Sequence, residues 1–211
     1  MFLLQGTTLL LHLSSIQFLI MENSGRKIIL AVTGASGSIY AIKLLELMRN
    51  IKDPPVEIAL VFSENAKEIW KYETGSSYHA VPPEKEYDNK SFFVPFASGS
   101  SDYDTMIICP ASMGILGRIA NGTSEDLIAR AADVILKEKR KLIAVPRETP
   151  YNLVHIRNME TITLAGGIVC PATPSFYSKP GSIEDLVMTV VERIASLAGF
   201  DTGIYRWMKN D

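Results

Sequence analysis

A cation and a carboxylate stand side by side in the segment Pro146-Arg147-Glu148-Thr149-Pro150, which directly follows an apolar run. The two prolines restrict the backbone on either side, a rigidity that an ordinary solvated turn does not require. An Arg147 guanidinium held in this way can form a two-pronged contact with a phosphate. Glu148, held among cations, stays ionised and can accept a proton. The segment therefore indicates an anion-binding site with a proton acceptor beside it.

A second pair of cations, Arg130 and Lys137, is separated by seven residues. This is nearly two helical turns, so a helix places both side chains on one face, where they can reach one site. The alternative is a solvated stripe bridged by Asp133, with each ion pair contributing only a few tenths of a kcal/mol. The spacing alone leaves both interpretations open.

Small and polar residues follow three apolar runs. The first is the turn Thr33-Gly34-Ala35-Ser36-Gly37-Ser38, whose backbone N–H groups at the start of a helix would attract an anion such as a phosphate or a flavin edge. It matches neither the G-x-G-x-x-G dinucleotide motif nor a P-loop, and a tight β-α corner needs small residues in any case. Ser63 and the segment Ala111-Ser112-Met113-Gly114 follow the other two runs, and helix capping is the alternative role for Ser63 and Ser112.

Two further donors occur near the C-terminus. Tyr177, in Pro174-Ser175-Phe176-Tyr177, and Arg193 would both add hydrogen bonds to a phosphate. Taken singly, Tyr177 is as well explained as a packed aromatic and Arg193 as a surface cation with a buried stem.

These residues require a scaffold that brings strand ends together, and the hydrophobic pattern provides one. Short apolar runs alternate with helical patterns, as in β-α units around a parallel sheet, and the strands are apolar on both faces. We therefore predict a single-domain α/β fold with a doubly wound, flavodoxin-like or Rossmann-like parallel sheet, which places a ligand at the carboxyl ends of the strands. Strands are expected at 28–32, 56–62, 106–109, 142–145 and 167–170, and helices at 39–48, 65–70, 126–137, 153–164 and 183–197. The stretch 72–104 is expected to be an irregular excursion with a short strand at 91–94.

Composition limits the class of protein. A chain of 211 residues with 47% hydrophobic residues can bury one substantial core, and a formal net charge of -2 without charged blocks argues against a nucleic-acid partner. The only two cysteines, Cys109 and Cys170, follow apolar runs and suit a reducing cytoplasm. The three histidines are far apart, so no metal site is expected.

The first twenty residues are apolar but have no Lys or Arg ahead of the apolar stretch, so a secretory signal is not expected. Polar interruptions make the run a poor membrane span. We expect an N-terminal extension over 1–20, with Met21 as an alternative start, and one flavoprotein-type domain over 21–211. An amphipathic partner-binding role for the extension stays open.

The combination of motifs resembles the flavin prenyltransferases of the UbiX group, from about Lys27 to Trp207. The most specific blocks are Arg130-Ala-Ala-Asp133-Val and Pro146-Arg147-Glu148-Thr149-Pro150, in this order. The glycine turn is much less specific. The resemblance implies a metal-independent transferase that moves a dimethylallyl group from dimethylallyl monophosphate to reduced FMN. The prenylated FMN would serve a UbiD-type decarboxylase, and FMN would lie between subunits of a homo-oligomer, usually a dodecamer.

The resemblance also implies roles for single residues. Contacts to FMN are implied for Gly34, Ala35, Ser36, Ser63, Ala111, Ser112, Met113, Gly114 and Arg147. The prenyl phosphate would be surrounded by Arg130, Lys137, Tyr177 and Arg193, with Phe92 beside the prenyl group. Glu148, Ser36 and Lys137 are the implied catalytic residues, with Glu148 taking part in proton removal. The absence of Asp-Asp-x-x-Asp clusters, which hold magnesium on prenyl diphosphates, favours a monophosphate donor.

Three departures and two alternatives accompany this resemblance. Ala111 stands where many relatives have cysteine, Asp126 where they have asparagine, and Phe92 where tryptophan is common; phenylalanine is the weaker cation–π partner. One alternative is a flavin-dependent cysteine decarboxylase of the same superfamily. That alternative is disfavoured because no histidine occurs between Met21 and Tyr78 and the substrate-clamping segment is missing. The other is a non-catalytic FMN carrier, which would have no use for Arg130, Lys137, Glu148 and Tyr177 together.

Overall fold

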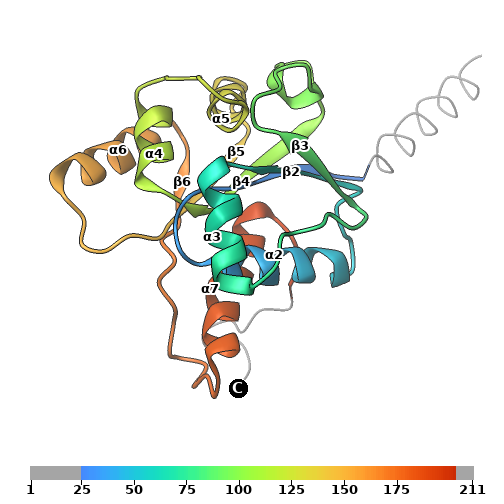
Figure 1. Cartoon of the computed structure of the whole chain (residues 1–211), viewed down its shortest axis with the longest axis vertical. Helices are drawn as coiled ribbons and strands as arrows, with labels where there is room; N and C mark the ends of the chain where they lie inside the picture. The colour runs from blue at the N-terminus through green and yellow to red at the C-terminus, as the bar shows by residue number, and fades with distance from the viewer. Residues whose placement is uncertain (1–24, 203–211) are drawn as a thin grey trace, which may run out of the picture.

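The computed structural model describes residues 25–202 of the chain, which form a parallel sheet covered by helices on both faces (Figure 1). The strands are β1 (Lys27–Val32), β2 (Glu57–Phe62), β3 (Glu84–Asp88), β4 (Tyr103–Ala111), β5 (Lys141–Pro146) and β6 (Ile168–Val169). The α-helices are α2 (Ser38–Asn50), α3 (Glu64–Thr74), α4 (Met113–Ala120), α5 (Leu127–Lys137), α6 (Leu153–Leu164) and α7 (Ile183–Ala198), and the 3-10 helix η1 covers Pro95–Ala97.

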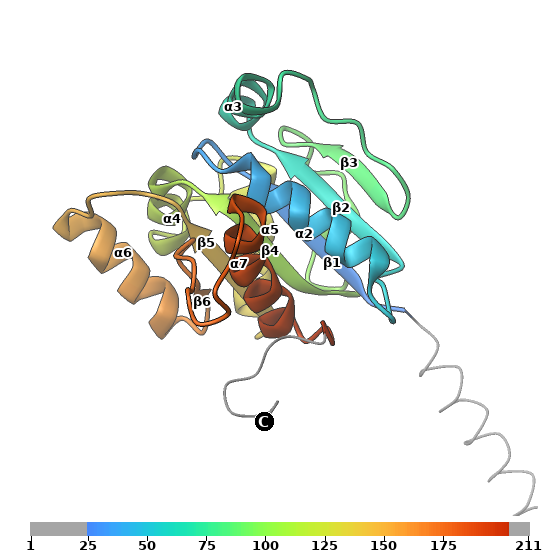
Figure 2. The ribbon, with the colours of Figure 1, turned by 90° about the horizontal axis from the view of Figure 1, so that it is seen from below.

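The six strands are arranged in the order β3-β2-β1-β4-β5-β6, and all neighbours are parallel. This is the Rossmann-like order, so the expected doubly wound parallel sheet is confirmed. Helices α2, α3 and α7 pack on one face of the sheet, and α4, α5, α6 and η1 pack on the other. Figure 2 shows α2 and α7 side by side across the first face.

The chain changes direction between β1 and β4, the two central strands. From β1 it continues into α2 on one face, and from β4 it continues into α4 on the opposite face. Adjacent strands whose connections leave in opposite directions open a crevice at their carboxyl ends, which is where doubly wound proteins bind ligands. The fold therefore places the Gly34 turn and Ser112 on the two sides of this crevice.

Apart from the strand expected at 91–94, the expected strands and helices are confirmed, with shifts of up to four residues at their ends. The strand predicted at 91–94 is wrong: these residues lie in a loop, and the strand of this region is β3, at Glu84–Asp88. Helix α4 was not among the expected helices, because it has only eight residues and contains two glycines. Asp126 is the N-cap of α5, and its side chain accepts from the Ala129 amide and pairs with Arg118.

Both edges of the sheet are distinctive. Edge strand β3 has the sequence Glu-Lys-Glu-Tyr-Asp, and edge strand β6 has only two residues. Beyond β6, helix α6 buries Ile162 but leaves Leu153, Val154, Ile156 and Leu164 exposed. Within 25–202, no helix is long and apolar enough to cross a membrane. The expected extension at 1–20 and the alternative start at Met21 lie outside the described residues.

Candidate functional site

The carboxyl ends of the strands bring most of the predicted site residues into one row. Backbone hydrogen bonds join neighbouring ends: Ser63 N donates to Val32 O at 3.0 Å, and Arg147 N donates to Ala111 O at 3.3 Å. We call this set the strand-end row. Its members are Gly34, Ala35, Ser36, Ser63, Ala111, Ser112, Met113, Gly114, Arg147 and Glu148. The convergence that the parallel-sheet rule predicts for these residues is confirmed.

The two serines of the row cap helices. Ser63 Oγ accepts from the Ala66 amide at 3.2 Å at the start of α3, and Ser112 Oγ accepts from the Ile115 amide at 3.4 Å at the start of α4. The capping role that the sequence left open is therefore confirmed for both. A hydroxyl that accepts a bond still has its own O–H to donate, and the first amides of a helix have no acceptor within the helix. Capping and anion binding are thus compatible at both positions.

The glycine turn differs from expectation, because two of its backbone amides donate to a carboxylate of the same chain, that of Glu73. Gly37 is the N-cap of α2 at φ 115°, and the Gly37 and Ser38 amides donate to the Glu73 carboxylate at 3.0 and 2.7 Å. A Cβ at Gly34 would lie 2.8 Å from the Cβ of Asn65, so only glycine allows the turn to pass this close to α3. The prediction that the amides of this turn are free to bind a phosphate or flavin edge is therefore wrong for Gly37 and Ser38.

Glu73 lies in the last turn of α3, and sequence reasoning missed it. Burial alone would raise the pKa of this carboxyl, but hydrogen bonds from Ser36, Ser38 and Gly37 outweigh burial and hold the pKa below its usual range. The carboxylate also faces the positive end of the α2 dipole. Because Glu73 is 36 residues from Gly37, no local motif signals the contact.

Arg147 and Glu148 meet the turn from the end of β5. Arg147 Nε donates to the Ser36 carbonyl oxygen at 2.9 Å, which joins the two segments that the sequence singled out. Glu148 is exposed, and its Oε1 accepts from the Thr149 amide at 3.0 Å. This bond holds the carboxylate at the rim of the row, where it can accept a proton from a bound molecule.

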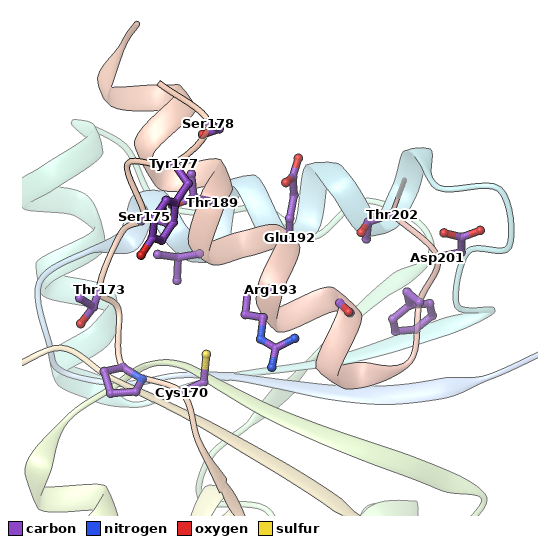
Figure 3. A pocket seen from close by; sticks show the side chains of 14 residues that line it. Cys170, Thr173, Ser175, Tyr177, Ser178, Thr189, Glu192, Arg193, Asp201 and Thr202 are labelled. Atoms are coloured by element: carbon purple, nitrogen blue, oxygen red, sulfur yellow. Dashed lines mark hydrogen bonds between the residues drawn. The ribbon is translucent and has the colours of Figure 1, made fainter. Parts of the chain in front are cut away.

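A cavity of about 970 Å³ lies between the segment 170–178 and helix α7 (Figure 3). The segment is joined to the end of β5 by a bond of 3.0 Å from the Ala172 amide to the Pro146 carbonyl oxygen. Tyr177 and Arg193 both line it, so the structure brings these two predicted donors together. The segment is fixed to α7 by a bond of 3.0 Å from the Ser175 amide to Thr189 Oγ1. Arg193 points toward Cys170; burial raises the pKa of that thiol, and the Arg193 charge partly offsets the effect.

Arg130, Lys137 and Phe92 lie elsewhere, and we call these three residues the α5 face. Arg130 Nε donates to the Ala97 carbonyl at 3.2 Å, and Lys137 Nζ would lie 2.7 Å from a Cβ at Gly99. Both cations therefore share one helix face, as the spacing predicts, but that face is turned toward the loop before β4. Lys137 is four residues before the amino end of β5, at the edge of the sheet opposite to the strand-end row.

The solvated-stripe alternative is partly confirmed on this face. Arg130 pairs with Asp133 at 3.1 Å, whereas the acidic partner of Lys137 is Glu138. Phe92 is 44% exposed in the loop after β3. Asn89, three residues before Phe92, fixes the start of that loop to α5, because it accepts from the Leu127 and Ile128 amides. Within one chain, the α5 face and the strand-end row are two separate groups of predicted site residues.

The strand-end row suits a flavin mononucleotide in its donor chemistry. Two serine-capped helix starts offer hydroxyl and amide donors to a phosphate, and Arg147 adds a charged donor. A Cβ added at Gly114 would meet only Ser112 Oγ, at 4.0 Å, so the start of α4 is open to a ligand. Within residues 25–202, no three His, Cys, Asp or Glu side chains gather as a metal site would require.

Comparisons with known proteins identify the class to which this fold and site belong. The sequence profile of the Flavoprotein family matches residues 20–195, so the chain is a member of the Flavoprotein family. Flavin prenyltransferase UbiX of Methanocaldococcus jannaschii is 42% identical over 184 residues, which cover 86% of this chain and 98% of that protein. Within the flavoproteins, the chain therefore belongs to the flavin prenyltransferase family.

Solved structures agree with this assignment. The crystal structure of AnUbiX (PadA1) in complex with FMN and dimethylallyl pyrophosphate is 41% identical, with a TM-score of 0.81, and the match covers 89% of this chain and 100% of that one. A dodecameric FMN-dependent UbiX-like decarboxylase from Escherichia coli O157:H7 is 35% identical, with a TM-score of 0.80 and coverage of 86% and 99%. The family resemblance drawn from the motifs is confirmed.

Proposed function

We propose that this chain transfers a dimethylallyl group from a dimethylallyl phosphate to reduced FMN. The observation that carries the proposal is the strand-end row, where two serine-capped helix starts and Arg147 present donors for a phosphate and a flavin. The cavity lined by Tyr177 and Arg193 adds two further donors. Membership of the flavin prenyltransferase family supports the same reaction. A cysteine decarboxylase is disfavoured because this family relationship covers nearly the whole domain.

Each group has a role in this reaction that follows from its chemistry. When bound, reduced FMN supplies the nucleophile for the allylic carbon. Tyr177 and Arg193 donate to the phosphate, so they stabilise the charge that builds on the leaving group. Glu148 accepts the proton released when the new ring closes, and its bond to the Thr149 amide keeps its carboxylate oriented. Ser36, held between Arg147 and Glu73, borders the reacting edge.

The α5 face can contribute to this site only if it comes from a second copy of the chain. Arg130 and Lys137 carry the charge that a prenyl phosphate requires, but they face the loop before β4 of their own chain. We therefore propose that FMN and the donor lie between subunits, where the α5 face of one copy meets the strand-end row of another. A dodecamer is the assembly we expect, since a dodecameric relative is known.

The proposal extends to the setting of the reaction. The product would be passed to a UbiD-type decarboxylase, which uses prenylated FMN. Cys109 and Cys170 are both free thiols, which suits the proposed cytoplasmic location. We propose that donor binding needs no metal, because the cations of this chain supply the charge.

An anaerobic product assay tests the activity. The protein is incubated with reduced FMN and either dimethylallyl monophosphate or dimethylallyl diphosphate, each with and without a chelator, and the flavin is examined by mass spectrometry. We expect a mass gain of one five-carbon unit with the monophosphate, unchanged by the chelator. FMN binding without any mass gain would instead identify a carrier. Product from the diphosphate alone would correct the donor.

A further inference from the structure

Thr33 is a buried polar residue at the crevice between β1 and β4. It is the first residue after β1 and only 2% exposed. Its hydroxyl donates to the Pro110 carbonyl oxygen at 2.9 Å and accepts from the Ser112 amide at 2.8 Å. The Thr33 amide donates to the same Pro110 oxygen at 3.2 Å. Thr33 thus joins the end of β1 to the end of β4 by three bonds.

These bonds occur where the sheet itself provides few. Beyond Ala31 and Ile108 the paired register of β1 and β4 ends, and their chains leave for opposite faces of the sheet. Ser112 is the N-cap of α4, so its amide has no acceptor within the helix. Thr33 supplies that acceptor. Two of the three bonds that hold the Gly34 turn near the start of α4 therefore come from one side chain.

The Thr33 hydroxyl has no proton left to donate to a ligand, because that proton is donated to Pro110, and its remaining acceptor lone pair is on a side chain that is only 2% exposed. Any effect of Thr33 on ligand binding must act through Gly34–Ser36 on one side and Ser112–Gly114 on the other. An FMN that touches both sides binds well only when the two sides are correctly spaced. We infer that Thr33 is a positioning residue that holds the two halves of the FMN site in register; this inference rests on the FMN binding in the proposed function.

A set of near-isosteric variants tests the inference by FMN affinity, measured by quenching of flavin fluorescence. Thr33→Val keeps the branched shape but removes both hydroxyl bonds, and Thr33→Ser keeps them. We expect the FMN dissociation constant to rise about ten-fold or more in Thr33→Val, as for loss of a buried hydrogen bond, and to stay within about three-fold in Thr33→Ser. Thr33→Ala provides the same comparison if Thr33→Val does not fold.

The matched control is Thr105→Val at the opposite end of the sheet. Thr105 is 1% exposed on β4, and its hydroxyl accepts from Arg26 at 2.9 Å, far from the strand-end row. Thr105→Val should lower the thermal midpoint, since it also removes the hydrogen bond of a buried threonine hydroxyl. It should leave FMN affinity within about two-fold, because Thr105 does not contact either side of the proposed FMN site.

Two results would overturn the inference: wild-type FMN affinity in Thr33→Val, or an equal loss of affinity in Thr105→Val. The second result would assign the effect to general stability. Prenyl transfer by the wild-type chain is measured in the separate product assay, so a failure of the proposed function appears there. A failure of the Thr33 inference appears in the dissociation constants.

Discussion

The strand-end row and the α5 face are built in different ways. The row is assembled from the ends of four strands, and backbone bonds between neighbouring strands fix its spacing. The α5 face consists of two side chains on one helix and a loop, and its cations are held by the Ala97 carbonyl and by the carboxylates of Asp133 and Glu138. The row has the rigidity that holding a flavin requires. The cations of the α5 face, Arg130 and Lys137, form ion pairs within their own chain only at the protein surface.

Under the proposed function, a subunit contains two half-sites rather than one site. A fold that assembled the whole site within a chain would bring Arg130 and Lys137 to the carboxyl ends of the strands. Instead, Lys137 lies at the amino edge of the sheet.

Mixed oligomers should show the largest effect. Glu148→Gln removes the proton acceptor of the row, and Lys137→Ala removes a cation of the α5 face. We expect each to lower turnover by about 100-fold or more. When the two variants are co-assembled in equal amounts, about a quarter of the sites should combine two intact halves, and turnover should return to about a quarter of the wild-type value. A mixture as inactive as its components would place the whole site within one chain.

The separate affinities for FMN and for the prenyl donor should also distinguish the strand-end row from the α5 face. Arg147→Ala removes a charged donor from the row, so we expect FMN affinity to fall about ten-fold and donor affinity to fall less. Lys137→Ala should weaken donor binding more than FMN binding. Calorimetric titration of each ligand measures both effects, with Lys71→Ala, an exposed cation on α3, as the control. The reverse order for Lys137 would assign that residue to FMN.

Acid titration should show how much the charge of Glu73, which holds the glycine turn beside the row, contributes to the stability of the fold. The pKa of Glu73 is lowered in the folded protein, so its contribution is present above its ordinary pKa and is lost as the pH falls through the folded value. At pH 7, Glu73→Gln should lower the free energy of unfolding by about 1 kcal/mol, as expected for loss of a helix cap. The difference from wild type should shrink below about pH 4. Urea unfolding at several pH values measures it, and a constant difference would contradict the role of the charge.

Asp133→Asn should have the smallest effect. The Arg130–Asp133 pair lies on an exposed helix surface at 3.1 Å, so we expect a loss of only about 0.3 kcal/mol, near the limit of detection in urea unfolding. A loss above about 1 kcal/mol would show that the pair stabilises the α5 face far more than its exposure suggests.

The sequence predicts the central strands well because a parallel strand covered on both faces is a short apolar run, as 28–32 and 142–145 are. It does not predict β3, since an edge strand with one neighbour tolerates Glu84, Lys85 and Glu86. The strand was predicted at 91–94 because Phe92 and Phe93 are apolar, yet both are exposed in a loop. Burial patterns thus report how many neighbours a strand has as well as where it lies.

The site, like the fold, was predictable only in part. Parallel strands place their carboxyl ends at one edge, so Ser63, Ser112 and Arg147 could be grouped without coordinates. Helical spacing correctly places Arg130 and Lys137 on one face, but spacing cannot say what that face contacts. Glu73 could not be predicted, because its partners Gly37 and Ser38 are 36 and 35 residues away and the contact depends on how α3 packs beside the turn.

The two edges of the sheet limit how copies of the chain can join. Pairing through β3 would place the exposed charges of Lys85, Glu86 and Asp88 against those of a second copy, and β6 is too short to guide an added strand. A continuous sheet through two subunits is therefore disfavoured. Within 25–202, helices and loops are the remaining surfaces for contact between copies, and the exposed Leu153, Val154, Ile156 and Leu164 of α6 offer an apolar one. The outer surface of α6 is therefore where we expect copies of the described part of the chain to join.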